Sequence, residues 1–244
     1  MDDYRPVDSF DEPNAARYDD LAQRGDEEAA VAFLHGMAGS GRALELGIGT
    51  GRLALPLAAR GVVVDGIDLS EPMVARLRAK PGGDRLDVTI GDFADVGVSG
   101  RYRLVYVAFN SFFNLLSQDE QVRCFENVAA HLTDDGAFVI EAFVPTFLVR
   151  LEHDQYVHAE GIKVDGVRLD VLRHDGATQM IEENHVSLSA AGLHFNPVVQ
   201  RYAWPAELDL MARIAGLRLG ERWSGWSREP FTLTSDVHVS VYVR

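Results

Sequence analysis

Cysteine and basic residues are scarce in this sequence, and each scarcity excludes a class of function. Cys124 is the only cysteine, so no intramolecular disulfide and no metal site built on several thiolates can form. Lys and Arg number 23 against 37 Asp and Glu, which gives a formal net charge of −14. A chain this acidic repels the phosphates of nucleic acids and of anionic membranes, so we expect neither as a partner.

Long apolar runs are also missing. No stretch approaches the ~18 uninterrupted apolar residues of a membrane-spanning helix, and the acidic start lacks the apolar run of a signal peptide. We therefore expect a cytoplasmic protein. The 8 histidines lack the i, i+4 pairing of a helical zinc site, and Asp134-Asp135 is expected to form a turn, so no metal is predicted.

Short apolar runs separated by helical patterns fill the first 145 residues. The chain has 244 residues and is 47% hydrophobic, which is enough to build the core of one α/β domain that carries an insertion. Strands that alternate with helices indicate βαβ units and a mostly parallel sheet. The expected strands are residues 42–46, 62–67, 86–90, 104–109 and 137–143.

The pattern changes after the fifth expected strand. Residues 155–204 alternate between apolar and polar and are interrupted by Asp165-Gly166 and Asp175-Gly176, which are strong hairpin signals. We expect an antiparallel meander here, followed by a helix that opens with Pro205 and by two final strands. The predicted division is a core of residues 1–145 and 205–244, with 1–25 as an N-terminal arm, and an insertion of residues 146–204.

A glycine-rich loop follows the first expected strand and reads Glu45-Leu46-Gly47-Ile48-Gly49-Thr50-Gly51. Three glycines at alternate positions allow a tight turn and a close approach of the backbone to a ligand. The dinucleotide fingerprint G-x-G-x-x-G/A is met only in weakened form, because counting from Gly49 its third position falls on Ala54. A nicotinamide-dependent oxidoreductase therefore stays open at this point.

Asp68 ends the second expected strand, 17 residues beyond Gly51. A carboxylate at this place can accept hydrogen bonds from both ribose hydroxyls of an adenosine. A capping role is less suitable for Asp68, because Ser70 already caps the next helix. Asp65, on the same strand, is expected to be solvated.

A second carboxylate stands after the third expected strand, in the sequence Gly91-Asp92-Phe93. Asp92 could accept from an adenine amino group, while Phe93 supplies an apolar wall. Met73 could cover the opposite face of the ring. Gly-Asp alone usually marks only a turn, and its spacing after Asp68 is what makes it informative.

Taken together, these motifs resemble the class I S-adenosylmethionine-dependent methyltransferases in order and spacing. The resemblance implies a seven-stranded, mostly parallel Rossmann-like sheet in which residues 237–243 form the last, antiparallel strand, with an antiparallel β insertion after strand 5. It implies S-adenosylmethionine as cofactor. The implied binding residues are Tyr18, Glu45, Gly47, Ile48, Gly49, Gly51, Asp68, Leu69, Met73, Gly91, Asp92, Phe93, Phe109 and Asn110.

Within this family, residues 16–21 resemble the lid of members that methylate small molecules. The sugar N,N-dimethyltransferases and the glycine N-methyltransferase-like enzymes are most similar in layout, and they also carry antiparallel strands after strand 5. This likeness implies an N or O atom of a small secondary metabolite as acceptor, Tyr18 near the methionine end of the cofactor, and an insertion that caps the acceptor. We expect Trp204 and Phe195 to be walls of that site.

Methyl transfer depends chiefly on holding the nucleophile, methyl carbon and sulfur in line, which can contribute ~7–11 kcal/mol. A general base is needed only where the nucleophile must lose a proton. The candidates are Glu141, His185 and His194, and no spacing rule selects among them. A non-catalytic S-adenosylmethionine-binding protein, with the insertion as the surface of a homodimer, is the remaining alternative.

Overall fold

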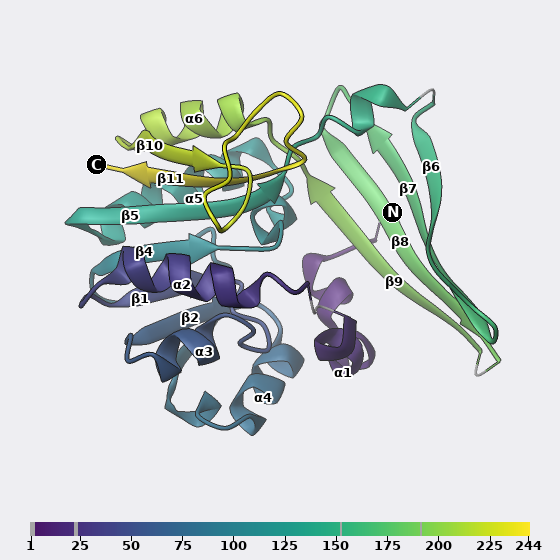
Figure 1. Cartoon of the computed structure of the whole chain (residues 1–244), viewed down its shortest axis with the longest axis horizontal. Coiled ribbons are helices and arrows are strands. Elements are labelled where there is room, and N and C mark those ends of the chain that lie inside the picture. Colours follow the sequence, from purple (N-terminus) through teal and green to yellow (C-terminus); the bar gives the residue numbers. More distant parts are fainter. Residues whose placement is uncertain (1–2, 22–23, 152, 191) are drawn as a thin grey trace.

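Two sheets organise the chain (Figure 1). The computed structural model describes residues 3–21, 24–151, 153–190 and 192–244. The larger sheet has seven strands in the order β10-β11-β5-β4-β1-β2-β3. Its strands are β1 (Ala43–Leu46), β2 (Val64–Asp68), β3 (Asp87–Ile90), β4 (Tyr102–Val107), β5 (Leu132–Phe143), β10 (Arg218–Trp223) and β11 (Val237–Val243).

The strand directions confirm the predicted fold class. β1 pairs in parallel with both β2 and β4, β3 is parallel to β2, and β5 is parallel to β4. β11 is antiparallel to β5 on one side and to β10 on the other. The chain order reverses between β1 and β4, and a reversal of this kind opens a crevice at the carboxyl ends of the strands, where ligands bind.

Helices cover both faces of this sheet (Figure 1). On one face α2 (Glu27–Ala38), α3 (Ala54–Ala59) and α4 (Glu71–Ala79) bury their apolar sides against the strands. On the other face α5 (Gln118–His131) and α6 (Pro205–Ile214) do the same. Because both faces are covered, the central strands are apolar on both sides. The caps follow the sequence: Ser70 Oγ accepts from the backbone N–H of Met73 at 3.2 Å, and Ser117 forms a capping box with Glu120.

The smaller sheet stands apart from the larger one, between β5 and α6 in the chain (Figure 1). It is an antiparallel meander of β6 (Gln155–Lys163), β7 (Gly166–Asp175), β8 (Met180–Ser189) and β9 (Gly192–Arg201). Leu172 and Ile181 belong to the core cluster that contains α5 and α6. Since side chains alternate along a strand and paired residues share a face, these two define the inner face of the small sheet.

The N-terminal segment connects the two sheets. It contains a short 3-10 helix, η1 (Pro6–Phe10), and α1 (Glu12–Leu21). Ser9 Oγ donates to the carbonyl of Pro197 on β9 at 2.6 Å, and Ser70 Oγ donates to the carbonyl of Phe10 at 2.6 Å. The segment is therefore tied both to the small sheet and to the start of α4. Other 3-10 turns are η2 (Gly83–Arg85), η3 (Ser111–Asn114) and η4 (Leu148–Arg150).

Two expectations about single elements are wrong. Asp65 is buried and not solvated, because β2 is paired on both sides, with β1 and with β3. Its Oδ2 accepts from the Tyr102 hydroxyl at 2.8 Å and pairs with Arg42. Asp134 and Asp135 lie within β5 and not in a turn before it, with an irregularity in the pairing to β4.

No helix within the described ranges is long and apolar enough to cross a membrane.

We predict that Gly66→Ala destabilises the protein. A Cβ at Gly66 would lie 2.4 Å from Cδ1 of Ile48, and overpacking of this kind costs ~1–3 kcal/mol. Urea denaturation should show this loss in the free energy of unfolding. Gly36→Ala is the control, because Gly36 is exposed within α2 and a Cβ there meets nothing within 4 Å, so stability should be equal or higher. Equal stability of the two variants would contradict the prediction.

Candidate active site

A cavity opens at the carboxyl ends of the parallel strands, beside the reversal of strand order. It has an empty volume of about 870 Å³, including the part that is open to solvent. The glycine loop, the end of β2, α4 and the loops after β3 and β4 form its floor and sides, and η1 and α1 form its remaining wall. The predicted residues that line it are Tyr18, Gly47, Gly49, Asp68, Leu69, Met73, Asp92 and Phe93.

The glycine loop needs its glycines for backbone conformation. Gly47, Gly49 and Gly51 all have positive φ, at 72°, 54° and 80°, where other residues are strained. A Cβ on Gly49 would also lie 3.3 Å from the terminal methyl of Met73. The loop therefore leaves open a cradle that larger residues would fill, as a cofactor lying against the backbone requires.

Asp68 fastens this loop to the end of β2. One carboxylate oxygen accepts from the backbone N–H of Gly49 at 2.6 Å, and the other accepts from that of Ser70 at 2.8 Å. Burial raises the pKa of Asp68, and these backbone donors oppose the shift. Each oxygen keeps a second lone pair, so the side chain can still accept a ribose hydroxyl.

Asp92 and Phe93 lie together at the side of the cavity that follows β3. Oδ1 of Asp92 accepts from the backbone N–H of Ala94 at 2.8 Å, which fixes the turn. Met73 and Leu69 line the cavity as well. These positions fit an adenine ring with an apolar wall and a carboxylate close to its edge, as the sequence predicts.

Glu45 and Tyr18 lie near the glycine loop. Burial raises the pKa of Glu45 to about 8, while a hydrogen bond from the Tyr106 hydroxyl at 2.9 Å and the charge of Arg52 oppose the shift. Burial likewise raises the pKa of Tyr18 to about 12, with Arg52 opposing it. The Tyr18 ring forms part of the cavity wall, whereas Glu45 lies below the loop at the end of β1.

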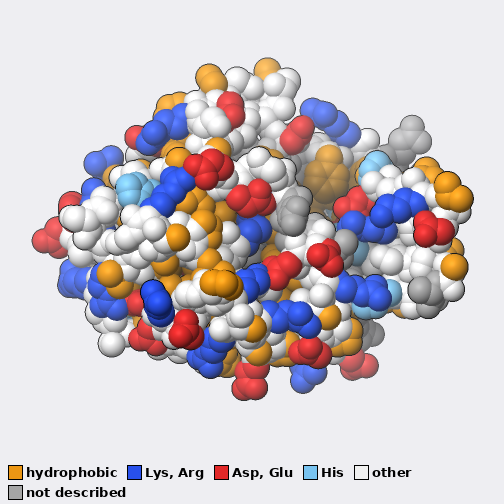
Figure 2. Space-filling model, turned by 60° about the horizontal axis from the view of Figure 1, so that its bottom comes forward, with side chains coloured by type: hydrophobic (Ala, Val, Ile, Leu, Met, Phe, Trp, Pro, Cys, Tyr) orange, Lys and Arg blue, Asp and Glu red, His pale blue; other side chains and the backbone are white. Residues whose placement is uncertain are grey.

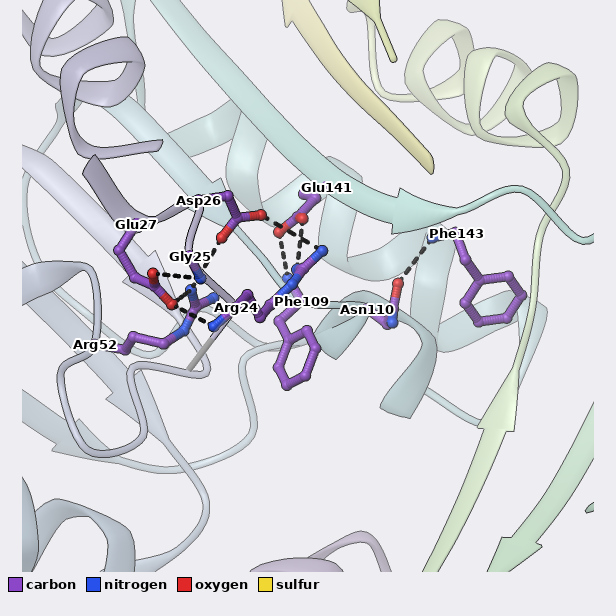
Figure 3. A network of polar contacts seen from close by, with 9 residues as sticks. All are labelled: Arg24, Gly25, Asp26, Glu27, Arg52, Phe109, Asn110, Glu141 and Phe143. Carbon is purple, nitrogen blue, oxygen red and sulfur yellow. Dashed lines mark hydrogen bonds and ion pairs between the residues drawn. The ribbon is translucent and has the colours of Figure 1, made fainter. Parts of the chain in front are cut away.

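Phe109 and Asn110 do not line the cavity, although the sequence places them in the correct loop. Both have positive φ, at 54° and 63°. The Asn110 side chain accepts from the backbone N–H of Phe143 at 2.8 Å and so ties the loop to the end of β5. The Phe109 ring lies beneath the guanidinium groups of Arg24 and Arg52 (Figure 3). Ile48, Gly51 and Gly91 also stay outside the lining, and their backbone positions shape it.

Glu141 is occupied by structural contacts. One oxygen pairs with Arg24 at 2.7 Å and the other accepts from the backbone N–H of Phe109 at 2.8 Å (Figure 3). Its side chain is buried. These contacts make it a support of the Phe109 turn and an anchor for the chain that follows α1, and they leave it poorly suited to accept a proton from a substrate.

The two candidate histidines both lie on the inner face of the small sheet. His194 Nε2 contacts Asn14 Oδ1 of α1 at 2.9 Å, which connects β9 with the arm. His185 Nδ1 pairs with Oδ1 of Asp170 at 2.7 Å, and its Nε2 lies 4.0 Å from Oε2 of Glu183. No motif in the sequence pointed to Asp170 and Glu183, which lie beside His185. The hairpin signal at Asp175-Gly176 could have indicated them, because this hairpin sets the register that brings Asp170 opposite His185.

The apolar candidates behave differently from what we expected. Phe195 is 54% exposed and lies on the outer face of the small sheet, so it is not a wall of the cavity. Trp204 packs against the apolar core at the start of α6. The direction of Phe195 follows the alternation of β9, whose register the sequence spacing alone did not give.

Charged side chains of both signs are interspersed over the face shown in Figure 2, without a basic patch. Histidines gather on the lobe formed by the small sheet, at the right of that view. Five of the eight lie between residues 153 and 194. The face shown therefore offers no continuous basic track.

Known proteins resemble this chain in sequence and in structure. Residues 43–136 match the methyltransferase domain family. The CcbJ methyltransferase from Streptomyces caelestis has 38% sequence identity and a TM-score of 0.92, over 98% of this chain and 99% of that one. The cypemycin N-terminal methyltransferase of a Streptomyces species is 29% identical over 79% of this chain and 78% of its own length. A dTDP-3-amino-3,6-dideoxy-α-D-glucopyranose N,N-dimethyltransferase of Streptomyces fradiae is 28% identical over 59% of this chain and 55% of its own length.

We predict that Asp68→Ala weakens binding of S-adenosylmethionine at least tenfold, because the variant loses an acceptor and releases the Gly49 backbone. Titration calorimetry measures the affinity. Asp95→Ala is the control, because Asp95 pairs with Arg123 outside the cavity and should bind the cofactor normally. Unchanged affinity in Asp68→Ala would remove the proposed ribose contact.

We also predict a pH dependence from Glu45. Its pKa is about 8 in the folded chain against 4.5 for the free group, so the folded state binds more protons between these values. The stability that protonated Glu45 contributes to the folded state is therefore fully present below pH 4.5, and it is lost as the pH rises towards 8. In the absence of cofactor, Glu45→Gln should therefore gain stability relative to the parent protein over this range, by at least about 1 kcal/mol. Urea denaturation at several pH values measures it, and parallel pH curves would refute it.

Proposed function

Because this chain belongs to the S-adenosylmethionine-dependent methyltransferases, we propose that it methylates the nitrogen of a small, amine-bearing secondary metabolite. The names of two relatives support this choice of atom: one is an N-terminal methyltransferase, and the other is an N,N-dimethyltransferase of an amino sugar. The low content of basic residues and the formal charge of −14 argue against nucleic acid as the acceptor.

The observation that carries the proposal is the enclosure of the cavity. Pro6, Val7 and Phe10 of η1 and Tyr18 of α1 close the wall opposite the glycine loop. The arm itself is held by Asp19, which accepts from Thr50 Oγ1 at 2.5 Å and pairs with Lys80 at 2.7 Å. A macromolecular acceptor would have to displace this arm, whereas a small molecule fits beside it.

The residues of this chain act mainly by positioning. When bound, the cofactor supplies a methyl group already activated by its sulfonium sulfur. Asp68 and the glycine loop hold the donor, and the aromatic wall of Phe10 and Tyr18 excludes water and favours a positive charge. Holding the acceptor nitrogen in line with the methyl carbon can contribute ~7–11 kcal/mol.

Incubation with S-adenosylmethionine carrying a deuterated methyl group tests the proposal. The acceptor panel holds amino sugars, peptides with a free N-terminus, their N-acetylated forms and tRNA. Mass spectrometry should find the label on a free amine and on no N-acetylated counterpart. Methylation of tRNA alone, or of a hydroxyl in the N-acetylated compounds, would overturn it.

A further inference from the structure

The inner face of the small sheet carries a group of ionisable side chains that no cofactor contact uses. In the register of the sheet, Asp170 of β7 lies opposite His185 of β8, and Glu183 is two residues from His185 on the same strand. Since alternate residues of a strand share a face, all three point to the side on which Ile181 is buried in the core. We call these three residues the Asp-His-Glu group.

The geometry of the group fixes which nitrogen of His185 is free. Nδ1 lies 2.7 Å from Asp170 Oδ1, so the proton of the neutral ring is held at Nδ1 and the lone pair remains on Nε2. Nε2 lies 4.0 Å from Glu183 Oε2. The two carboxylate side chains are each 18% exposed and the His185 side chain is 37% exposed, so the group is partly enclosed and still reachable.

The surroundings of the group are acidic. Burial raises the pKa of Glu183, with the negative charges of Asp170 and Glu160 adding to the shift and His185 opposing it. Arg168, which shares this face on β7, is already paired with Glu160 at 2.5 Å. His158 lies opposite Asp170 on β6 and stacks on Tyr156, and His194 on β9 contacts Asn14. The carboxylates therefore outweigh the cations that face the group, and a positively charged ligand would be attracted.

A second observation points to a ligand. Asn196 lies opposite His185 on β9 and shares its face. Its Oδ1 is buried and has no hydrogen-bond partner within the described part of the chain. A buried acceptor without a donor costs ~1–3 kcal/mol, and a ligand with N–H groups would satisfy it.

The group is continuous with the cofactor cavity. Asn114, which lines the cavity, lies 3.5 Å from the side-chain nitrogen of Gln200 on β9. Val198 precedes Gln200 by two residues on β9, where the rise is ~3.4 Å per residue. Val198 lies opposite Glu183 in the register of the sheet. The Asp-His-Glu group is thus the next part of the inner face beyond the wall of the cavity.

The ligand atoms of Asp170, Glu183 and His185 lie within 4.8 Å of one another, and the gap between Nε2 and Oε2 favours an ammonium over a zinc ion. A zinc ion held ~2.1 Å from both Nε2 and Oε2 would subtend an angle of about 145° across the 4.0 Å gap, far from tetrahedral. An ammonium nitrogen at hydrogen-bond distance, ~2.9 Å from each, subtends roughly a right angle, which its N–H directions can meet. The gap therefore fits a protonated amine better than zinc.

We propose that the Asp-His-Glu group binds the protonated amine of the acceptor and takes its proton through His185 Nε2. This inference rests on the proposed function. The ammonium proton passes to Nε2, which leaves a neutral amine with a free lone pair and an imidazolium paired with Asp170. The lone pair forms the nitrogen–carbon bond as the methyl–sulfur bond breaks, and that electron pair stays on sulfur. The imidazolium then returns its proton to water at its exposed edge.

The binding part of the inference is testable without knowledge of the natural acceptor. The full chain, saturated with S-adenosylhomocysteine and labelled with ¹⁵N, is titrated with D-glucosamine at neutral pH, and the ring nitrogens of His185 are followed by NMR. His185→Gln assigns the signal. Glucosamine should shift it, and N-acetylglucosamine, which has no charge, should not. An equal response to both sugars, or no response, overturns the inference.

Two variants of adjacent residues separate the inner face from the outer. Glu183→Gln should weaken the glucosamine response at least tenfold. Glu182→Gln is the matched control, because Glu182 points to the opposite face and pairs with Arg173, and it should respond like the parent protein. Urea denaturation confirms that both variants are folded. A titration with zinc alone completes the test: micromolar zinc binding that glucosamine cannot displace would make the group a metal site and refute the inference.

The proton transfer is tested on any amine that the panel assay finds to be methylated. His185→Gln should lower kcat 10²–10⁴-fold with unchanged affinity for S-adenosylhomocysteine, whereas Glu183→Gln should mainly raise the acceptor KM. An unchanged kcat in His185→Gln overturns the proton transfer. If the panel shows no methylation but the His185 signal still responds to glucosamine, the proposed function fails while the ammonium site stands.

Discussion

The shape of the cavity depends on the hydrogen bonds that the carboxylate of Asp68 accepts. By accepting from the backbone of both Gly49 and Ser70, it joins the glycine loop after β1 to the start of α4. A buried carboxylate is costly to desolvate, and a ligand that brings further donors lowers that cost. The same side chain can therefore both shape the cavity and bind the donor.

The N-terminal arm turns this crevice into an enclosed site. It touches the larger sheet through Ser70 and Thr50 and the smaller sheet through Ser9 and His194. Each contact is a single hydrogen bond or ion pair, worth on the order of 1 kcal/mol. Together these contacts keep the arm across the open side of the cavity.

Much of the site followed from short-range patterns. The glycine spacing, Asp68 and Asp92 each stand directly after an apolar run, and in a parallel sheet such ends gather at one edge. Glu141, Phe109 and Asn110 were harder to interpret, because a residue at the correct edge can point into the cavity or away from it. Their direction depends on Arg24, which is 117 residues from Glu141 in the chain, and on left-handed backbone at Phe109 and Asn110.

The sequence by itself determined the class of fold, the cofactor loop and the antiparallel meander, because strand alternation, glycine spacing and hairpin residues act over a few neighbouring positions. Only the tertiary structure decided which polar residues meet. Asp170 joins His185 through the register of a hairpin, and Asp65 meets Arg42 and Tyr102 across strands that are far apart in the chain. Such contacts depend on how strands are aligned and packed, and no local pattern records that alignment. The glycine loop lines the proposed donor site, and the inner face of the small sheet carries the proposed site of the acceptor.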